Sequence, residues 1–163
     1  MKSLEEAEAL WLRSSDEEAF ELDLFCEKPI IVRRLKKFPK TLASLTFGQY
    51  DDMQHQKVQS DLTIWINFIT SEESGQGMYL IQFLKTLAKE YGLALGAQPQ
   101  PLRPKKWHAN RHFYHRSDEM IAWYKKHLFT ELKFKDSSQV WYFPTSLKPE
   151  INLRINLEKS QAE

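Results

Sequence analysis

The sequence predicts an α+β fold in one domain that covers residues 1–150, followed by a tail over residues 151–163. Three observations predict it. Six segments rich in β-branched and aromatic residues are typical of strands, and longer segments with apolar residues at helical spacing are typical of helices. In the middle of the chain a strand, a helix and a second strand follow one another closely, which predicts a βαβ unit.

The N-terminal part of the chain, residues 1–27, is acidic and is expected to be helical. The segment "SLEEAEALWLRS" has apolar residues at helical spacing, and a second acidic helix is predicted over residues 16–25. Two strands are then predicted from "IIVRRL" and "TLASLTFGQY". The polar residues 51–60 predict the loop of a hairpin.

The segment "DLTIWINFIT" is apolar at most positions, as in a central strand that is covered on both faces. From Met78 apolar residues recur at helical spacing up to Gly92, where a C-terminal cap is expected. The segment "LALGA" predicts a short strand that returns beside the first. A helix over "SDEMIAWYKKHLF" and a hairpin formed by "ELKFK" and "QVWYF" complete the predicted fold.

The net charge of +1 hides an uneven distribution of charged residues. Residues 28–40 and the predicted loop 99–116 carry basic side chains and no acid, which can steer an anionic partner or simply form solvated faces. No apolar run approaches the roughly 20 residues of a membrane span, and the N-terminus lacks the pattern of a signal peptide. The single cysteine, Cys26, cannot form an internal disulfide bond. We therefore expect a cytoplasmic protein without a membrane segment.

The junction "SEESGQG" between the predicted central strand and its helix contains Gly75 and Gly77. Two explanations fit: a bend that must be tight, or a cradle of backbone N–H groups for phosphate at a helix N-terminus. The two glycines alone do not decide. The segment is not a dinucleotide fingerprint, because Leu80 stands at the third glycine, and no Gly-Lys-Ser/Thr sequence of a P-loop follows.

The spacing after Gly77 is more specific. Four residues follow it at intervals of three, seven, eleven and fifteen: Leu80, Leu84, Ala88 and Gly92. This series resembles the acetyl-CoA motif of the GNAT superfamily of N-acetyltransferases. The segment "WYKKHLF" is similar to the family's aromatic-Tyr-x-x-x-Gly-Phe ending, with Tyr124 at the tyrosine. The resemblance covers about residues 30–147 and implies a GNAT-like fold: a central, twisted, mixed but mostly antiparallel sheet of about six or seven strands, flanked by helices, with a βαβ unit for the cofactor.

The resemblance implies that the protein transfers an acetyl group from acetyl-CoA to a primary amine of an unidentified acceptor, by direct attack of the amine on the thioester. It also implies that one set of residues binds the pantetheine arm and another the pyrophosphate. The arm would be bound by Phe68, Ile69 and Thr70, and the pyrophosphate by Ser74, Gly75, Gln76, Gly77, Met78 and Tyr79. By family position, Tyr124 would donate a proton to the leaving thiolate; a buried helix tyrosine with a satisfied hydroxyl is the alternative.

An acceptor amine must lose a proton before it attacks, so a base is required. Glu73 is a candidate catalytic residue, although an acid at a helix start is also favoured by the helix dipole. Histidines 108, 112 and 115 are spaced for a zinc site, but the prolines before them favour a loop, and we expect no metal. The basic and aromatic residues of loop 99–116 would suit an anionic or RNA-linked acceptor, or would dock on the body of the protein.

The alternative function is a catalytically silent GNAT-like fold that binds a protein or an RNA. It is favoured by Glu72, which stands where the family has Gln or Arg, and by Leu128, which replaces the glycine before Phe129. The sequence leaves the oligomeric state open, a homodimer included.

Overall fold

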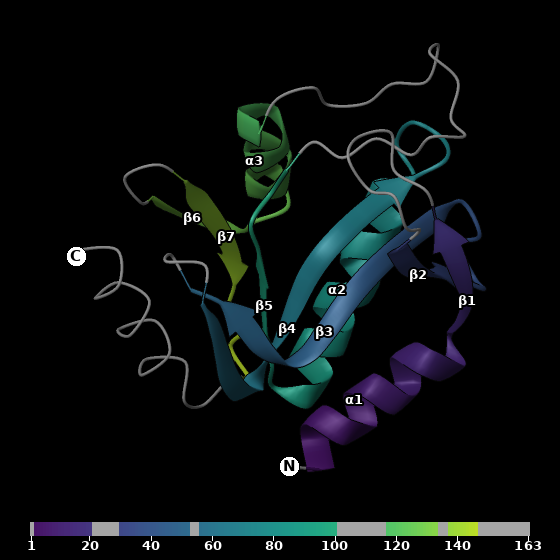
Figure 1. Ribbon diagram of the computed structural model, residues 1–163, viewed down its shortest axis with the longest axis horizontal. Helices are drawn as coiled ribbons and strands as arrows, with labels where there is room; N and C mark the ends of the chain where they lie inside the picture. The colour runs from purple at the N-terminus through teal and green to yellow at the C-terminus, as the bar shows by residue number, and fades with distance from the viewer. Residues whose placement is uncertain (1, 21–29, 53–55, 101–116, 134–136, 147–163) are drawn as a thin grey trace.

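The computed structural model describes residues 2–20, 30–52, 56–100, 117–133 and 137–146. In these ranges the chain forms three helices and seven strands (Figure 1). The helices are α1 (Lys2–Arg13), α2 (Gly77–Tyr91) and α3 (Ser117–Lys126). The strands are β1 (Ser15–Phe20), β2 (Ile30–Leu35), β3 (Thr41–Asp51), β4 (Lys57–Ser71), β5 (Ala94–Ala97), β6 (Thr130–Lys133) and β7 (Ser138–Tyr142). Of these helices, none has the length and apolar character needed to cross a membrane.

The seven strands form one twisted sheet in the order β1-β2-β3-β4-β5-β7-β6 (Figure 1). Every neighbouring pair is antiparallel except β4 and β5, which run parallel. The parallel pair is joined by α2, so the predicted βαβ unit is confirmed. The predicted α+β architecture, a mixed and mostly antiparallel sheet with flanking helices, is likewise confirmed.

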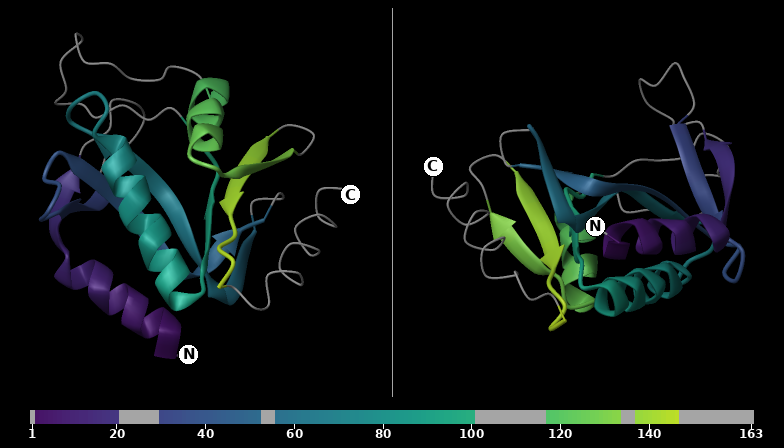
Figure 2. Two further views of the ribbon diagram at one scale, coloured as in Figure 1. Left: turned by 180° about the vertical axis from the view of Figure 1, so that it is seen from behind. Right: turned by 90° about the horizontal axis from the view of Figure 1, so that it is seen from below.

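Helices α1 and α2 cover one face of the sheet (Figure 2). Apolar residues of α2, such as Leu80 and Leu84, form the main core with Trp11 of α1 and with Ile64 and Ile66 of β4. The α2 helix ends as predicted: Gly92 adopts a left-handed conformation with a φ of 64°, and the following amide, that of Leu93, donates to the carbonyl of Ala88. The spacing of apolar residues along α2 therefore reflects the face that it buries.

The opposite face of the sheet has a second cluster, built around aromatic residues. Because neighbouring residues of a strand point to opposite faces, Trp65 lies on the face away from Ile64 and Ile66. There it packs with Tyr50 and Trp141. The central strand is thus covered on both faces along this part of its length, as its apolar sequence predicted.

The helix predicted over residues 16–25 is wrong where the structure describes it, because residues 15–20 form strand β1. The acidic residues of β1 lie opposite the basic residues of β2: Asp16 is in register with Arg34, and Glu18 forms an ion pair with Arg34 at 2.8 Å. Favourable pairs across two strands stabilise a sheet and here outweigh the local helix preference of an acidic segment. Helix α1 is therefore followed directly by a strand.

The hairpin loop predicted over residues 51–60 is also shorter than expected. Strand β3 continues to Asp51 and β4 begins at Lys57. At the ends of the connection the amide of Asp52 donates to the carbonyl of Gln56, and the Gln56 amide donates back to the Asp52 carboxylate at 2.9 Å. The polar residues 57–60 belong to a strand because they continue the pairing of β3 and β4 at a solvated part of the sheet.

Candidate functional site

Strands β4 and β5 separate in the middle of the sheet. They are in parallel register from Thr63 and Ala94 to Ile66 and Ala97, and no further β4–β5 pair forms in the described part of the chain. Strand β4 nevertheless continues to Ser71 and stays paired with β3 on its other side. Figure 1 shows the two strands diverging, with β5 on the side of α3. Beyond Ile66, one edge of β4 therefore has no neighbouring strand among the described residues.

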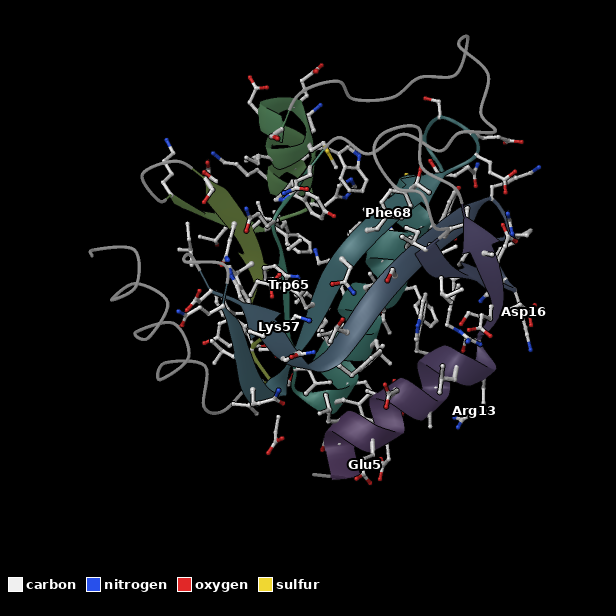
Figure 3. All side chains as sticks on the ribbon, viewed as in Figure 1. Glu5, Arg13, Asp16, Lys57, Trp65 and Phe68 are labelled. Atoms are coloured by element: carbon white, nitrogen blue, oxygen red, sulfur yellow. The ribbon has the colours of Figure 1, made fainter. Side chains whose placement is uncertain are left out.

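A β-bulge lies where the strands separate. In the register with β3, Phe68 pairs with Ser44 and Ile66 with Leu45, so Asn67 is an extra residue without an opposite partner in β3. The Asn67 side chain donates to the hydroxyl of Thr46 at 2.8 Å. A bulge takes its residue out of the ladder and bends the strand. Figure 3 shows Phe68 near the separating end of β4, with Trp65 closer to the paired part.

A cavity of about 260 Å³ occupies the space between the two strands. Its walls come from residues 66–71 of β4, from the turn and first residues of α2, from residues 97–100 after β5, and from one face of α3. Most of the expected cofactor-binding residues line it. They are Phe68, Ile69, Thr70, Ser74, Gly75, Gly77 and Met78. Tyr124 of α3, far away in the sequence, lines the same cavity.

The turn before α2 presents backbone groups to this cavity. Gly75 has a φ of 84°, a conformation that other residues adopt with strain, and an added Cβ would have no other atom within 4 Å. Gly77 begins α2 directly below Trp123, whose ring would lie 3.1 Å from any added Cβ. The residue before the helix, Gln76, makes no capping hydrogen bond with its side chain, and the first turn of α2 carries no acid. The N-terminus of α2 is thus free of the side-chain carboxylates and caps that commonly neutralise it.

The carboxylate of Glu72 is engaged by a cation outside the cavity lining. It forms an ion pair with Arg34 of β2, which also holds Glu18 of β1. The backbone amide of Glu72 donates to the carbonyl of Lys40 at 2.8 Å, which fixes the residue beside the start of β3. Glu72 does not line the cavity. The acid that departs from the family pattern is therefore compensated by a cation on a neighbouring strand.

Tyr124 is buried within α3, with 2% of its surface exposed. Its ring contacts Trp123 and Phe129 edge to face. Burial raises the pKa of the Tyr124 hydroxyl above its ordinary value, so the group stays protonated at neutral pH. The Tyr124 hydroxyl makes no hydrogen bond among the described residues. Every fully buried side-chain nitrogen or oxygen in these residues does make one, so the hydroxyl oxygen is not fully buried. Because Tyr124 lines the cavity, we infer that its hydroxyl is exposed there.

Three of the predicted site residues do not line the cavity. Glu73 is exposed and lies 3.7 Å from the ammonium group of Lys40. Gln76 is the residue before α2, and Tyr79 stacks on Phe38 with ring centroids 5.0 Å apart. The structure thus places Tyr124 in the cavity that the glycines of the turn line, whereas Glu73, in the same turn, does not line it.

Several cavity residues were not predicted from the sequence. They include Asn67 at the bulge and the α3-side residues Met120, Trp123 and His127. His127 follows Tyr124 by three residues, a spacing that places both side chains on one face of a helix, and this signal could have identified it. Burial lowers the pKa of His127, and the nearby charges of Lys85 and Lys126 lower it further.

The proposed histidine and basic cluster of loop 99–116 falls almost entirely outside the described residues, which resume at Ser117. Of that loop only Pro99 and Gln100 are described, and both line the cavity. Within the described ranges, no three His, Cys, Asp or Glu side chains lie close enough together to hold a metal ion.

No protein-family model, no curated protein and no solved structure matches this chain.

Proposed function

We propose that this protein is an acyltransferase that moves an acetyl group from acetyl-CoA to a primary amine, in a GNAT-like fold. The observation that carries the proposal is a single cavity that combines three features: an edge of β4 without a neighbouring strand in the described residues, an N-terminus of α2 without a side-chain cap, and the hydroxyl of Tyr124. Each feature suits a different part of a coenzyme A thioester. The resemblance in sequence supports the same assignment.

The open edge of β4 suits the pantetheine arm. Pantetheine is an extended chain with two amides, and amides can pair with an unpaired strand edge as a neighbouring strand does. Residues 67–71 form one wall of the cavity, and no other described strand lies beside them on that side. The lining also includes apolar side chains, among them Phe68, Ile69 and Met78, which can cover the methylene groups of the arm.

The start of α2 suits the pyrophosphate. The amide groups of an uncapped helix N-terminus bind anions, and the helix dipole adds about half a positive charge there. Gly75 allows a phosphate to approach the backbone closely, because no atom lies within 4 Å of the position that its Cβ would take. Because Arg34 neutralises Glu72, that carboxylate does not oppose the bound anion.

Transfer then depends on positioning and on proton movements. The acceptor nitrogen attacks the carbonyl carbon of the thioester, the C–N bond forms, and the C–S bond breaks with its electron pair on sulfur. Backbone N–H groups near the bulge at Asn67 are suited to stabilise the oxyanion. Tyr124 gives its proton to the sulfur, and it regains one from the nitrogen of the new amide.

Calorimetric titration with acetyl-CoA tests this function on the wild-type protein and on two variants. Ser74→Glu adds a negative charge at an exposed residue of the cavity wall, and Thr86→Glu adds the same charge farther along α2, away from the cavity. We expect wild type and Thr86→Glu to bind alike and Ser74→Glu to bind at least about tenfold more weakly. Lack of binding by the wild type would overturn the proposal. Equal binding by both variants would show that the coenzyme does not bind at this turn.

A further inference from the structure

The proposed reaction requires a base, and few of the described residues that line the cavity can accept a proton. An amine with a pKa near 10 is protonated at neutral pH and cannot attack until it loses that proton. The described lining residues include two titratable side chains, Tyr124 and His127, and no carboxylate. Tyr124 is protonated and serves as the acid, which leaves His127 as the group able to accept a proton. The inference below rests on the proposed function.

The main chain of His127 is fixed from two sides. Its amide donates to the carbonyl of Tyr124 at 3.0 Å, and its carbonyl accepts a hydrogen bond from the ammonium group of Lys85 at 2.9 Å. Lys85 lies on α2 and also contacts the ring of Tyr142, with its nitrogen 4.8 Å from the ring centroid. The end of α3 is thereby tied to the helix that would bind the phosphates.

The imidazole ring of His127 is also held in place. It contacts the ring of Trp123 edge to face, with centroids 4.7 Å apart, and Trp123 itself packs over Gly77. In the described part of the chain no hydrogen bond occupies the ring nitrogens. The ring thus borders the cavity with its acceptor nitrogen available.

The charges around His127 keep it neutral. Lys85 faces it from α2, and Lys126 precedes it on the α3 side. Glu131 of β6, a nearby carboxylate, lies 3.4 Å from the ammonium group of Lys125 instead. Burial and the two lysines lower the pKa of the imidazole below its ordinary value, so the neutral form, which accepts protons, predominates at pH 7.

We propose that His127 is the general base that deprotonates the acceptor amine in the same cavity in which Tyr124 protonates the leaving sulfur. The ammonium nitrogen of the acceptor gives one proton to His127 and attacks with the electron pair that is freed. His127 then releases that proton to solvent. Together with the exchange at Tyr124, each turnover forms one amide and one thiol and releases one proton.

Two amines of similar shape test this role with acetyl-CoA at pH 7. Ethylamine is protonated at this pH, whereas the fluorines of 2,2,2-trifluoroethylamine leave it mostly neutral. We expect His127→Gln to lower the rate of acetylation of ethylamine by about 100-fold or more, the usual contribution of a general base, and to change the rate with trifluoroethylamine much less. Lys133→Gln, a change at an exposed lysine that does not line the cavity, should affect both rates equally.

Equal losses with both amines in His127→Gln would assign His127 a structural role and overturn the inference. A second measurement is independent of turnover: the NMR signal of the His127 ring, assigned by its loss in His127→Gln, is followed while ethylamine is added to the complex with coenzyme A. A shifted signal supports the proposal, and an unchanged signal overturns it. If the wild type does not bind coenzyme A, the proposed function is overturned. If it binds coenzyme A but His127→Gln leaves the ratio of the ethylamine and trifluoroethylamine rates unchanged, only the role of His127 is overturned.

Discussion

Leu128 ends the α3 region in a left-handed backbone conformation, with a φ of 71°. This conformation is unfavourable for a residue with a side chain, and glycine is the usual solution at the end of a helix. The amide of Phe129 nevertheless donates to the carbonyl of Tyr124, as in a normal helix ending. The leucine that departs from the family pattern therefore keeps the backbone geometry that glycine would adopt, and 74% of its surface is exposed.

We expect Leu128→Gly to increase the free energy of unfolding by about 1 kcal/mol, because it removes backbone strain and little packing. Unfolding in urea measures the change. The control is Leu12→Gly, at another exposed leucine but inside α1, which should decrease the free energy of unfolding by about 1 kcal/mol. A loss of stability in both variants would contradict the argument.

At the scale of elements, one arginine connects β1, β2 and the turn before α2. The guanidinium group of Arg34 pairs with Glu18 of β1 and with Glu72 of the turn. Neighbouring Arg33 points elsewhere: it donates to the hydroxyl and carbonyl of Ser15. The two arginines are adjacent in sequence, yet only Arg34 neutralises the acid beside the candidate phosphate site.

We expect Arg34→Gln to weaken binding of coenzyme A by about threefold to tenfold, because the variant loses the positive charge that pairs with Glu72 near the phosphates. The double variant Arg34→Gln with Glu72→Gln should recover most of the affinity. Calorimetry at two salt concentrations measures both effects, and the loss should shrink at high salt. Arg33→Gln removes the same charge but keeps the ion pair between Arg34 and Glu72, so an equal loss in that variant would refute the role given to Arg34.

The elements also mark the limits of what the sequence predicted. The long apolar pattern of α2 and the glycine at its end were sufficient to predict the βαβ unit. The acidic segment "SDEEAF" could not be assigned correctly, because its strand depends on the basic residues of β2, which lie about fifteen residues later. Its own residues are compatible with a helix, and only the pairing with β2 makes the segment a strand.

The candidate site was predictable to the extent that it lies on consecutive residues. The end of β4 and the glycine turn were predicted together, whereas Trp123 and His127 come from a different segment and meet them only through the packing of α3. Periodicity shows which residues of a helix are buried, but not which cavity they line. Asn67 was missed because a bulge depends on the register with β3.

At the scale of the whole molecule, the four-residue strand β5 joins the two halves of the sheet. Gly96 pairs with Trp65 of β4 on one side and with Trp141 of β7 on the other. The two indole rings meet with centroids 5.8 Å apart, and a Cβ on Gly96 would lie 2.7 Å from the Trp141 ring. Trp141 is fully buried and donates to the side chain of Gln139. Glycine is required here by packing.

We expect Gly96→Ala to decrease the free energy of unfolding by about 1–3 kcal/mol, the usual cost of overpacking a core. Unfolding in urea measures it. In the background Trp141→Phe, which removes the ring atoms nearest to Gly96, the same substitution should cost clearly less. Equal costs in the two backgrounds would show that the contact with Trp141 is not the cause.

An open strand edge normally exposes a protein to aggregation, because a strand of another chain can pair with it. The open edge of β4 differs from the outer edges of the sheet, since it begins inside the sheet where β5 turns away. Residues 97–100 and the α3 face with Trp123 and Tyr124 stand across the cavity from it. A strand of another chain would have to enter this cavity of about 260 Å³ in order to pair with the edge. The same split in the sheet thus provides backbone groups for a ligand and protects them from other chains.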